Sequence, residues 1–181
     1  VAAPAMEKEV SLRILGPYAD ARKKRKDPIW QELAALVYQY CQNSRSVIAF
    51  VEGRRYAEKL AYYVNLLGGE AFAQVHHGSL AREQRQETET ALREGRLRLL
   101  CATSSMELGI DVGEIDQVLQ GGCPRTISST LQRLGRAGHN PSRTSVMYLF
   151  PRTAAECVLC GMTAQLAREN RVEKLNPPEG C

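Results

Sequence analysis

Residues 46–76 read SVIAFVEGRRYAEKLAYYVNLLGGEAFAQVH, and this stretch decides the fold. Ser46–Val51 is an apolar run of strand length, and Arg54–Leu67 has helical periodicity and ends at Gly68-Gly69. Ala71–His76 is again strand-like. A strand, a helix and a second strand in this order predict a parallel pair of strands joined by a right-handed crossover.

The same alternation continues along the chain. The sequence predicts a polar helix at Leu80–Glu94, with Ser79 as its N-cap and Gly95 as its stop. Further strands are expected at Leu97–Ala102, Gln117–Gln120 and Ser145–Phe150, and further helices at Ile127–Ala137 and Ala154–Asn170.

Before this repeating part, residues 9–15 alternate like a strand. Asp27-Pro28 predicts the start of a helix, with an aspartate N-cap and a proline in the first turn. Its expected core positions are Ile29, Trp30, Leu33, Val37 and Tyr40. Because the strands are continuously apolar, both faces of the sheet should be covered. The sequence therefore predicts an α/β fold of three layers, with a mainly parallel sheet flanked by helices.

Length and composition indicate one globular domain. The chain has 181 residues, 44% of them hydrophobic, and a net charge of +4 that permits a polyanionic partner. No apolar run approaches the ~20 residues of a membrane span, so no membrane partner is expected. The six cysteines lack the spacing of a disulfide framework, which favours reduced thiols and a cytoplasmic location.

We expect this single domain to be excised from a larger protein, because the chain begins with Val1. Residues 1–45 would hold the first strand, a basic loop and the first helix. Residues 46–152 would form the core, and residues 153–181 a closing helix and tail.

Polar side chains follow three of the expected strands. Arg54-Arg55, His76–Ser79 and Thr103–Ser105 each come directly after an apolar run. The carboxyl ends of parallel strands share one edge of the sheet, where such folds bind ligands. Hydroxyls, arginines and helix-start amides suit phosphate groups without reading bases.

Three other features leave alternatives open. The run Arg22–Lys26 is either a solvated loop or a phosphate-contacting loop. His76-His77 favour turn or backbone-positioning roles over metal binding, because adjacent histidines lack the spacing of a zinc-protease pair. Cys157-x-x-Cys160 is half of a possible zinc site without a second half, so packing is favoured and no metal is expected.

Residues 132–139 read QRLGRAGH and are expected to end the helix that begins near Thr126. On such a helix Gln132, Arg136 and His139 share one face, opposite an apolar face of Ile127, Leu131 and Leu134. Gly135 and Gly138 inside a helix would indicate that another group approaches closely. The chain has no G-x-x-x-x-G-K-[ST] loop and no G-x-S-x-G motif, so a self-contained nucleotidase or hydrolase is unexpected.

Three phrases in order carry a family resemblance: HHGSL at residues 76–80, ATSSMELGIDVG at residues 102–113 and QRLGRAGH at residues 132–139. Together they closely resemble the second RecA-like domain of superfamily 2 DEAD/DEAH-type helicases, and in particular the large helicase-related (Lhr) proteins. The resemblance runs from about Ser46 to Leu149. It implies a RecA-like, P-loop-NTPase-type fold, ATP with Mg²⁺ as cofactor and a role in DNA repair.

The resemblance also implies residue roles. Phe50 with Arg54 and Arg55 matches the fourth motif, where an arginine touches the nucleic-acid backbone. Thr103 matches the threonine that contacts a phosphate of the translocating strand. Other residues expected at the strand are His77, Gly78, Ser79 and Ser104.

On the nucleotide side, Gln132 matches the sensor of the γ-phosphate and Arg136 the arginine finger. Gly109 and Asp111 match the segment that links the strand contact to the nucleotide, and Arg133 and His139 are expected nearby. Two features depart from many relatives. His139 replaces a second arginine, and Glu52-Gly53 replace an amide and a hydroxyl. Glu52 beside a phosphate track would be unfavourable, which weakens the prediction for Arg54.

The leading hypothesis is the second motor domain of an ATP-dependent helicase that acts on single-stranded DNA or RNA. Its expected partner is the N-terminal RecA-like domain of the same protein, which would carry the phosphate loop. This chain alone should neither hydrolyse ATP nor unwind nucleic acid. A non-catalytic module that docks nucleic acid or protein is the rival. A superfamily 2 nuclease or remodelling translocase would share these motifs.

Overall fold

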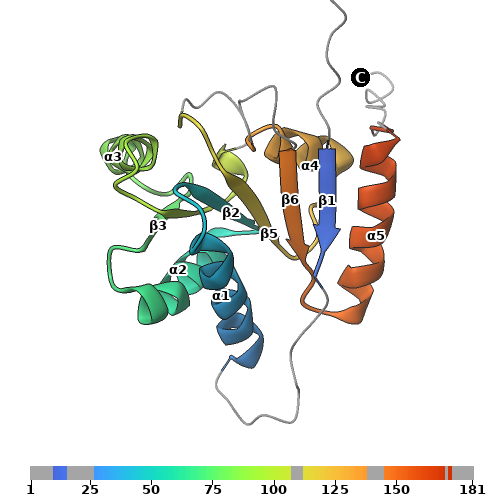
Figure 1. Cartoon of the computed structure of the whole chain (residues 1–181), viewed down its shortest axis with the longest axis horizontal. Helices are drawn as coiled ribbons and strands as arrows, with labels where there is room; N and C mark the ends of the chain where they lie inside the picture. The colour runs from blue at the N-terminus through green and yellow to red at the C-terminus, as the bar shows by residue number, and fades with distance from the viewer. Residues whose placement is uncertain (1–9, 16–26, 107–111, 138–144, 170, 173–181) are drawn as a thin grey trace, which may run out of the picture.

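The computed structural model describes residues 10–15, 27–106, 112–137, 145–169 and 171–172 (Figure 1). The described elements follow the predicted alternation. They are β1 (Val10–Ile14), α1 (Pro28–Cys41), β2 (Val47–Val51), α2 (Arg54–Gly68), β3 (Ala73–His76), α3 (Arg82–Arg93), β4 (Leu99–Ala102), the short 3₁₀ helix η1 (Ser104–Met106), β5 (Gln117–Gly121), α4 (Ile127–Leu134), β6 (Ser145–Phe150) and α5 (Ala154–Arg168).

The strands form one parallel sheet in the order β1-β6-β5-β2-β4-β3. After β2 the chain builds outward to β3, returns to β4, and then crosses to β5 on the other side of β2. The reversal puts a topological switch point at the carboxyl end of β2, between β4 and β5, which is where open α/β sheets bind ligands. The predicted α/β class is confirmed.

Two apolar layers cover the sheet. α1 and α2 pack on one face through Trp30, Leu33, Val37, Leu60 and Val64. On the opposite face, α3, α4 and α5 contribute residues that include Leu92, Ile127, Leu134, Cys160 and Ala164. Figure 1 shows the two groups of helices on either side of the sheet. The predicted burial of both faces is confirmed, and β2 is buried at every residue from Val47 to Val51.

One predicted helix cap is confirmed in position only, and another is wrong. Asp27 is the N-cap residue of α1 and Pro28 begins the helix, as predicted, but Asp27 adopts a left-handed backbone conformation, φ 56°, and its side chain makes no capping hydrogen bond. Its carboxylate instead pairs with Lys59 at 2.8 Å and accepts a hydrogen bond from the Tyr63 hydroxyl. Ser79 does not cap α3 either, because a turn from the His77 carbonyl to the Leu80 amide delays the helix to Arg82.

Helix α4 is shorter than predicted. The hydroxyl of Thr126 does cap it, accepting a hydrogen bond from the Ser129 amide at 3.0 Å. The helix ends at Leu134, so Gly135 is its C-cap rather than an interior residue, and Arg136 lies in the turn that follows. Ala137 leaves the helix to form a bridge with Ile115, which explains the early stop. Gly138 lies outside the described residues.

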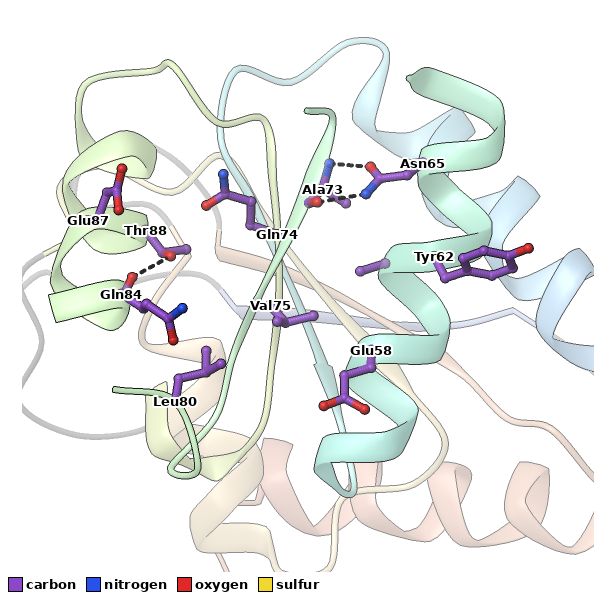
Figure 2. Close-up of a pocket in the computed structure, with 11 residues that line it drawn as sticks. Glu58, Tyr62, Asn65, Ala73, Gln74, Val75, Leu80, Gln84, Glu87 and Thr88 are labelled. Carbon is purple, nitrogen blue, oxygen red and sulfur yellow. Dashed lines mark hydrogen bonds between the residues drawn. The ribbon is translucent and has the colours of Figure 1, made fainter. Parts of the chain in front are cut away.

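The outer edge of β3 is partly closed by a side chain. Strand alternation turns the amide and carbonyl of Ala73 away from β4. The Asn65 side chain of α2 bonds both groups, at 2.8 Å from the Ala73 amide and 3.0 Å to the Ala73 carbonyl (Figure 2). Asn65 therefore occupies a position that a further strand would otherwise use.

Within the described part of the chain, no helix combines the length and apolar content that crossing a bilayer requires. The described cysteines, Cys41, Cys101, Cys123, Cys157 and Cys160, are free thiols. Burial raises the pKa of the Cys41 thiol to about 12, so this thiol stays protonated and packs as a small apolar group.

Candidate nucleic-acid interface

A cleft of about 510 Å³ lies at the carboxyl ends of the central strands. The loops after β2, β3 and β4 form one side, and the start of α4 forms the other. Its polar lining residues are Glu52, Arg54, His77, Ser79, Thr103, Ser104, Arg125, Thr126, Ser129 and Arg133. The three clusters predicted to meet at one edge of the sheet do meet there, because the parallel strands end together.

A chain of polar groups, partly buried except for the fully buried His76, lies behind Thr103. The Thr103 hydroxyl is 3.4 Å from the Ser105 hydroxyl, which is 3.0 Å from Nδ1 of His76. On its other side, Nε2 of His76 lies 2.8 Å from the Glu89 carboxylate of α3. A carboxylate can only accept, so Nε2 is the donor there. The fully buried His76 thus ties Thr103 to α3, and the predicted positioning role is the one that its contacts support.

The other residues predicted to contact the nucleic-acid strand differ in their exposure and in their partners. Nη1 of Arg54 donates to the Ser79 hydroxyl at 3.3 Å, so these two residues meet at the mouth of the cleft. Arg55 is exposed on the first turn of α2 but does not line the cleft. His77 is buried, with Nε2 3.3 Å from the Glu58 carboxylate. Gly78 is open to solvent, since nothing lies within 4 Å of a Cβ built on it.

Glu52 is held between two arginines. Its Oε1 lies 2.9 Å from Nη1 of Arg133, and its Oε2 lies 3.0 Å from Nε of Arg125. The carboxylate is therefore neutralised within the protein and does not confront the cleft as a bare negative charge. This contact removes the objection that the sequence raised against a phosphate track beside Glu52.

Arg133 has a setting that the sequence did not predict. Its side chain is 2% exposed, and its guanidinium lies 5.1 Å from the centre of the Phe50 ring. It also donates to the side-chain oxygen of Gln120 on β5. Arg133 therefore links α4 to β5 and to the loop after β2 through buried contacts.

The residues predicted at the nucleotide differ in position. Gln132 and Arg136 are half-buried near the end of α4 and do not line the cleft, whereas Arg133 lines it. Gly109, Asp111 and His139 lie outside the described residues, as does the Arg22–Lys26 run. Of the polar residues in and around α4, Arg125, Ser129 and Arg133 line the cleft, and Gln132 and Arg136 do not.

A second groove, of about 500 Å³, lies between α2 and α3 over the edge strand β3 (Figure 2). Glu58 and Glu87 supply its charges, and the residues that line it include no lysine or arginine. Among the described residues, no three His, Cys, Asp or Glu side chains gather as a metal ion would require. A polyanion therefore finds complementary charge in the cleft and not in this groove.

The family model of the helicase conserved C-terminal domain matches residues 30–140. This match covers more than half of the chain and includes the cleft. The chain belongs to the helicase C-terminal domain family.

Curated relatives of this helicase C-terminal domain include Lhr proteins, as the sequence motifs predicted. The Lhr helicase/probable uracil glycosylase of Mycolicibacterium smegmatis is 32% identical over 98% of the chain and 14% of its own length. The Lhr helicase/uracil glycosylase of Escherichia coli is 34% identical over 94% of the chain and 13% of its own length. The ATP-dependent helicase Lhr-Core of Methanocaldococcus jannaschii is 30% identical over 97% and 21%. The chain thus spans between about an eighth and a fifth of these relatives.

Solved structures confirm the RecA-like fold of the helicase C-terminal domain. The Mycobacterium smegmatis helicase Lhr, solved with single-stranded DNA and AMP-PNP, has a TM-score of 0.86 and 35% identity over 94% of the chain and 23% of that protein. The Escherichia coli DEAD-box protein SrmB, solved with RraA, has a TM-score of 0.71 over 96% of the chain and 99% of the SrmB chain. At 21% identity, SrmB bears on the fold alone.

Proposed function

We propose that this chain is the second motor domain of an ATP-dependent, Lhr-type helicase and supplies part of a single-strand track and the arginine finger. The observation that carries the proposal is the cleft that brings Arg54, Ser79 and Thr103 together on a helicase C-terminal fold. These groups suit a sugar-phosphate backbone, since they offer hydrogen-bond donors and positive charge without reading base edges. The Lhr relative solved with single-stranded DNA supports the same function.

The nucleotide proposal concerns Gln132 and Arg136. Both are half-buried rather than enclosed, as expected for side chains at an interface with another domain. An amide and a guanidinium at the end of one helix fit the edge of a triphosphate, because both can donate to its oxygens. Arg136 would stabilise charge on the transferring phosphoryl group. The Mg²⁺ and most phosphate contacts would come from the N-terminal RecA-like domain of the same protein.

The ATPase test uses the full-length protein that carries this domain. Arg136→Ala is expected to lower nucleic-acid-stimulated ATP hydrolysis by about 10³-fold or more, the scale of an arginine finger. Binding of single-stranded DNA should change less than about twofold, because Arg136 lies outside the cleft. Arg171→Ala is the matched control, since Arg171 is exposed and lies beyond α5. Retained ATPase activity in Arg136→Ala would remove the finger assignment.

A second experiment separates the motor from a docking module. The 181-residue chain is mixed with its N-terminal RecA-like domain, and ATP turnover is measured with and without single-stranded DNA. DNA-dependent turnover supports the motor. Association of the two domains and DNA binding without turnover would favour the non-catalytic docking module.

A further inference from the structure

Arg125 lines the cleft from the side opposite to the predicted strand contacts. It lies between the buried Pro124 and the N-cap Thr126 of α4, so the backbone on both sides of it is anchored. Its side chain is 79% exposed, in contrast to 2% for Arg133. Arg125 therefore presents an accessible guanidinium to the cleft from a fixed base.

The described ion pair of Arg125 is with Glu52, and Glu52 has a second cation. Arg125 is the exposed partner of the Arg125–Glu52 pair. Ion pairs of this kind contribute little to stability, so Arg125 can leave Glu52 for another partner at low cost. The Arg133–Glu52 pair is different, because moving Arg133 away from Glu52 would leave a charge in the interior. If Arg125 leaves, Glu52 remains neutralised by Arg133.

We propose that Arg125 is a further phosphate contact of the cleft, and that Glu52 masks its charge until a single strand binds. This inference rests on the proposed single-strand track. A guanidinium donates to phosphate oxygens as well as to carboxylate oxygens, so a phosphodiester can replace Glu52 as the partner of Arg125. Arg54, Ser79 and Thr103 would hold the strand from the sheet side, and Arg125 from the α4 side.

The position of Arg125 gives this contact a consequence. Arg125 begins the segment that leads through Thr126 directly into α4, and the same helix ends beside Gln132 and Arg136. A phosphate held by Arg125 therefore binds to the element that carries the proposed nucleotide residues. Strand binding and nucleotide binding would meet on one short helix.

The test measures binding of a fluorescein-labelled oligothymidylate to the 181-residue chain by anisotropy. Each phosphate contact to a single strand makes the logarithm of the binding constant fall by about 0.7 for each tenfold rise in salt concentration. On that basis Arg125→Gln should weaken binding about eightfold at ~50 mM salt and about threefold at ~200 mM salt. The matched control is Arg96→Gln. Arg96 is also exposed and paired with a glutamate, Glu94 at 2.6 Å, but precedes β4 at the opposite end of the sheet.

Glu52→Gln tests the masking. Release of Arg125 from an exposed pair should tighten binding about 1.5-fold to fivefold. In an Arg125→Gln background the same change should have no effect, because the other cation paired with Glu52 is Arg133, which is only 2% exposed and stays in place. Circular dichroism melts establish that each variant is folded. If Glu52→Gln does not fold, the binding affinity of Arg125→Gln alone still tests the phosphate contact.

The outcomes separate the two proposals. Arg125→Gln binding within about twofold of the wild type, with the wild type binding, would overturn the phosphate contact and leave the single-strand track standing. Equal tightening by Glu52→Gln with and without Arg125 would overturn the masking. A wild-type chain that does not bind the oligothymidylate under any of these conditions would overturn the proposed track, and this inference with it.

Discussion

The carboxylate of Glu52 lies 2.9 Å from the guanidinium of Arg133, although 81 residues separate them in the sequence. The contact joins the loop after β2 to α4 across the switch point of the sheet. Arg133 also donates to Gln120 of β5, so one buried guanidinium connects three elements that meet at the cleft. The site is thus held together by a buried charge as well as by apolar packing.

Arg133→Met should destabilise the chain by about 3 kcal/mol, the lower end of the range for breaking a buried ion pair, because Glu52 keeps Arg125 as a partner. Urea unfolding monitored by circular dichroism gives the free energy of unfolding. The double variant Glu52→Leu/Arg133→Met should be more stable than Arg133→Met alone, since it also removes the Glu52 carboxylate, which would keep only the exposed Arg125 as a partner. A cost below about 1 kcal/mol for Arg133→Met would contradict the structural role of this pair.

The fold could be predicted from the sequence because the patterns that specify its strands and its helices are both local. Apolar runs of strand length alternate with helical patterns, and parallel order follows from that alternation. The ends of helices were less accessible, since tertiary contacts set them. Asp27 binds Lys59 and Tyr63 rather than capping α1, and Ala137 leaves α4 to pair with Ile115.

The site was accessible only in part. Residues that follow parallel strands must meet at one edge of the sheet, so the approach of Arg54, Ser79 and Thr103 could be predicted. The pairing of Glu52 with Arg133 could not, because no periodicity relates two residues so far apart. Glu52 was the available signal, since a glutamate beside a phosphate track requires a cationic partner. Arg125, which stands just before the expected helix start, carried no signal of its own.

His76 gives a second prediction, because its ring holds the polar chain behind Thr103. His76→Ala should destabilise the chain by about 2 kcal/mol, since Ser105 and Glu89 lose a buried partner. It should also weaken single-strand binding by the 181-residue chain, because Ser105, which contacts the Thr103 hydroxyl, loses its bond to the His76 ring. Urea unfolding and anisotropy measure the two effects.

The control for His76 is Gln84→Ala on α3, whose exposed side chain should change stability by about 0.5 kcal/mol at most, as at ordinary surface positions. An unchanged free energy of unfolding in His76→Ala would mean that the polar chain behind Thr103 does not stabilise the fold. Unchanged DNA affinity, with the loss of stability, would restrict the role of His76 to packing.

Asn65 gives a third prediction at the edge of the sheet. Asn65→Ala leaves the amide and carbonyl of Ala73 without their side-chain partner, and should cost about 1–3 kcal/mol. Gln42→Ala is the matched control, because Gln42 also bonds a backbone carbonyl, that of Tyr38, but at an exposed position. Differential scanning calorimetry compares the two. Equal, small effects would show that solvent replaces Asn65 at no cost.

Glu156 gives a prediction that depends on pH. Burial alone would raise the pKa of its carboxyl, but hydrogen bonds from the Arg152 side chain and amide outweigh this and hold the pKa below its ordinary value. A carboxyl whose pKa is lower in the folded state stabilises the fold above its unfolded-state pKa. That contribution is lost as the pH falls through the folded-state value. Glu156→Gln should therefore cost about 1 kcal/mol near neutral pH, on the scale of a well-formed but partly exposed ion pair.

The same difference should shrink as the pH is lowered below the ordinary pKa of a glutamate, because the wild-type carboxyl becomes protonated and then resembles the glutamine. Urea unfolding of both proteins across this pH range measures it. Glu169→Gln is the control, since Glu169 is 43% exposed and lies 3.5 Å from Arg171, and it should change stability little at neutral or acid pH. A cost for Glu156→Gln that stays constant throughout the acid range in which the protein remains folded would mean that hydrogen-bond geometry, and not the charge of Glu156, stabilises the start of α5.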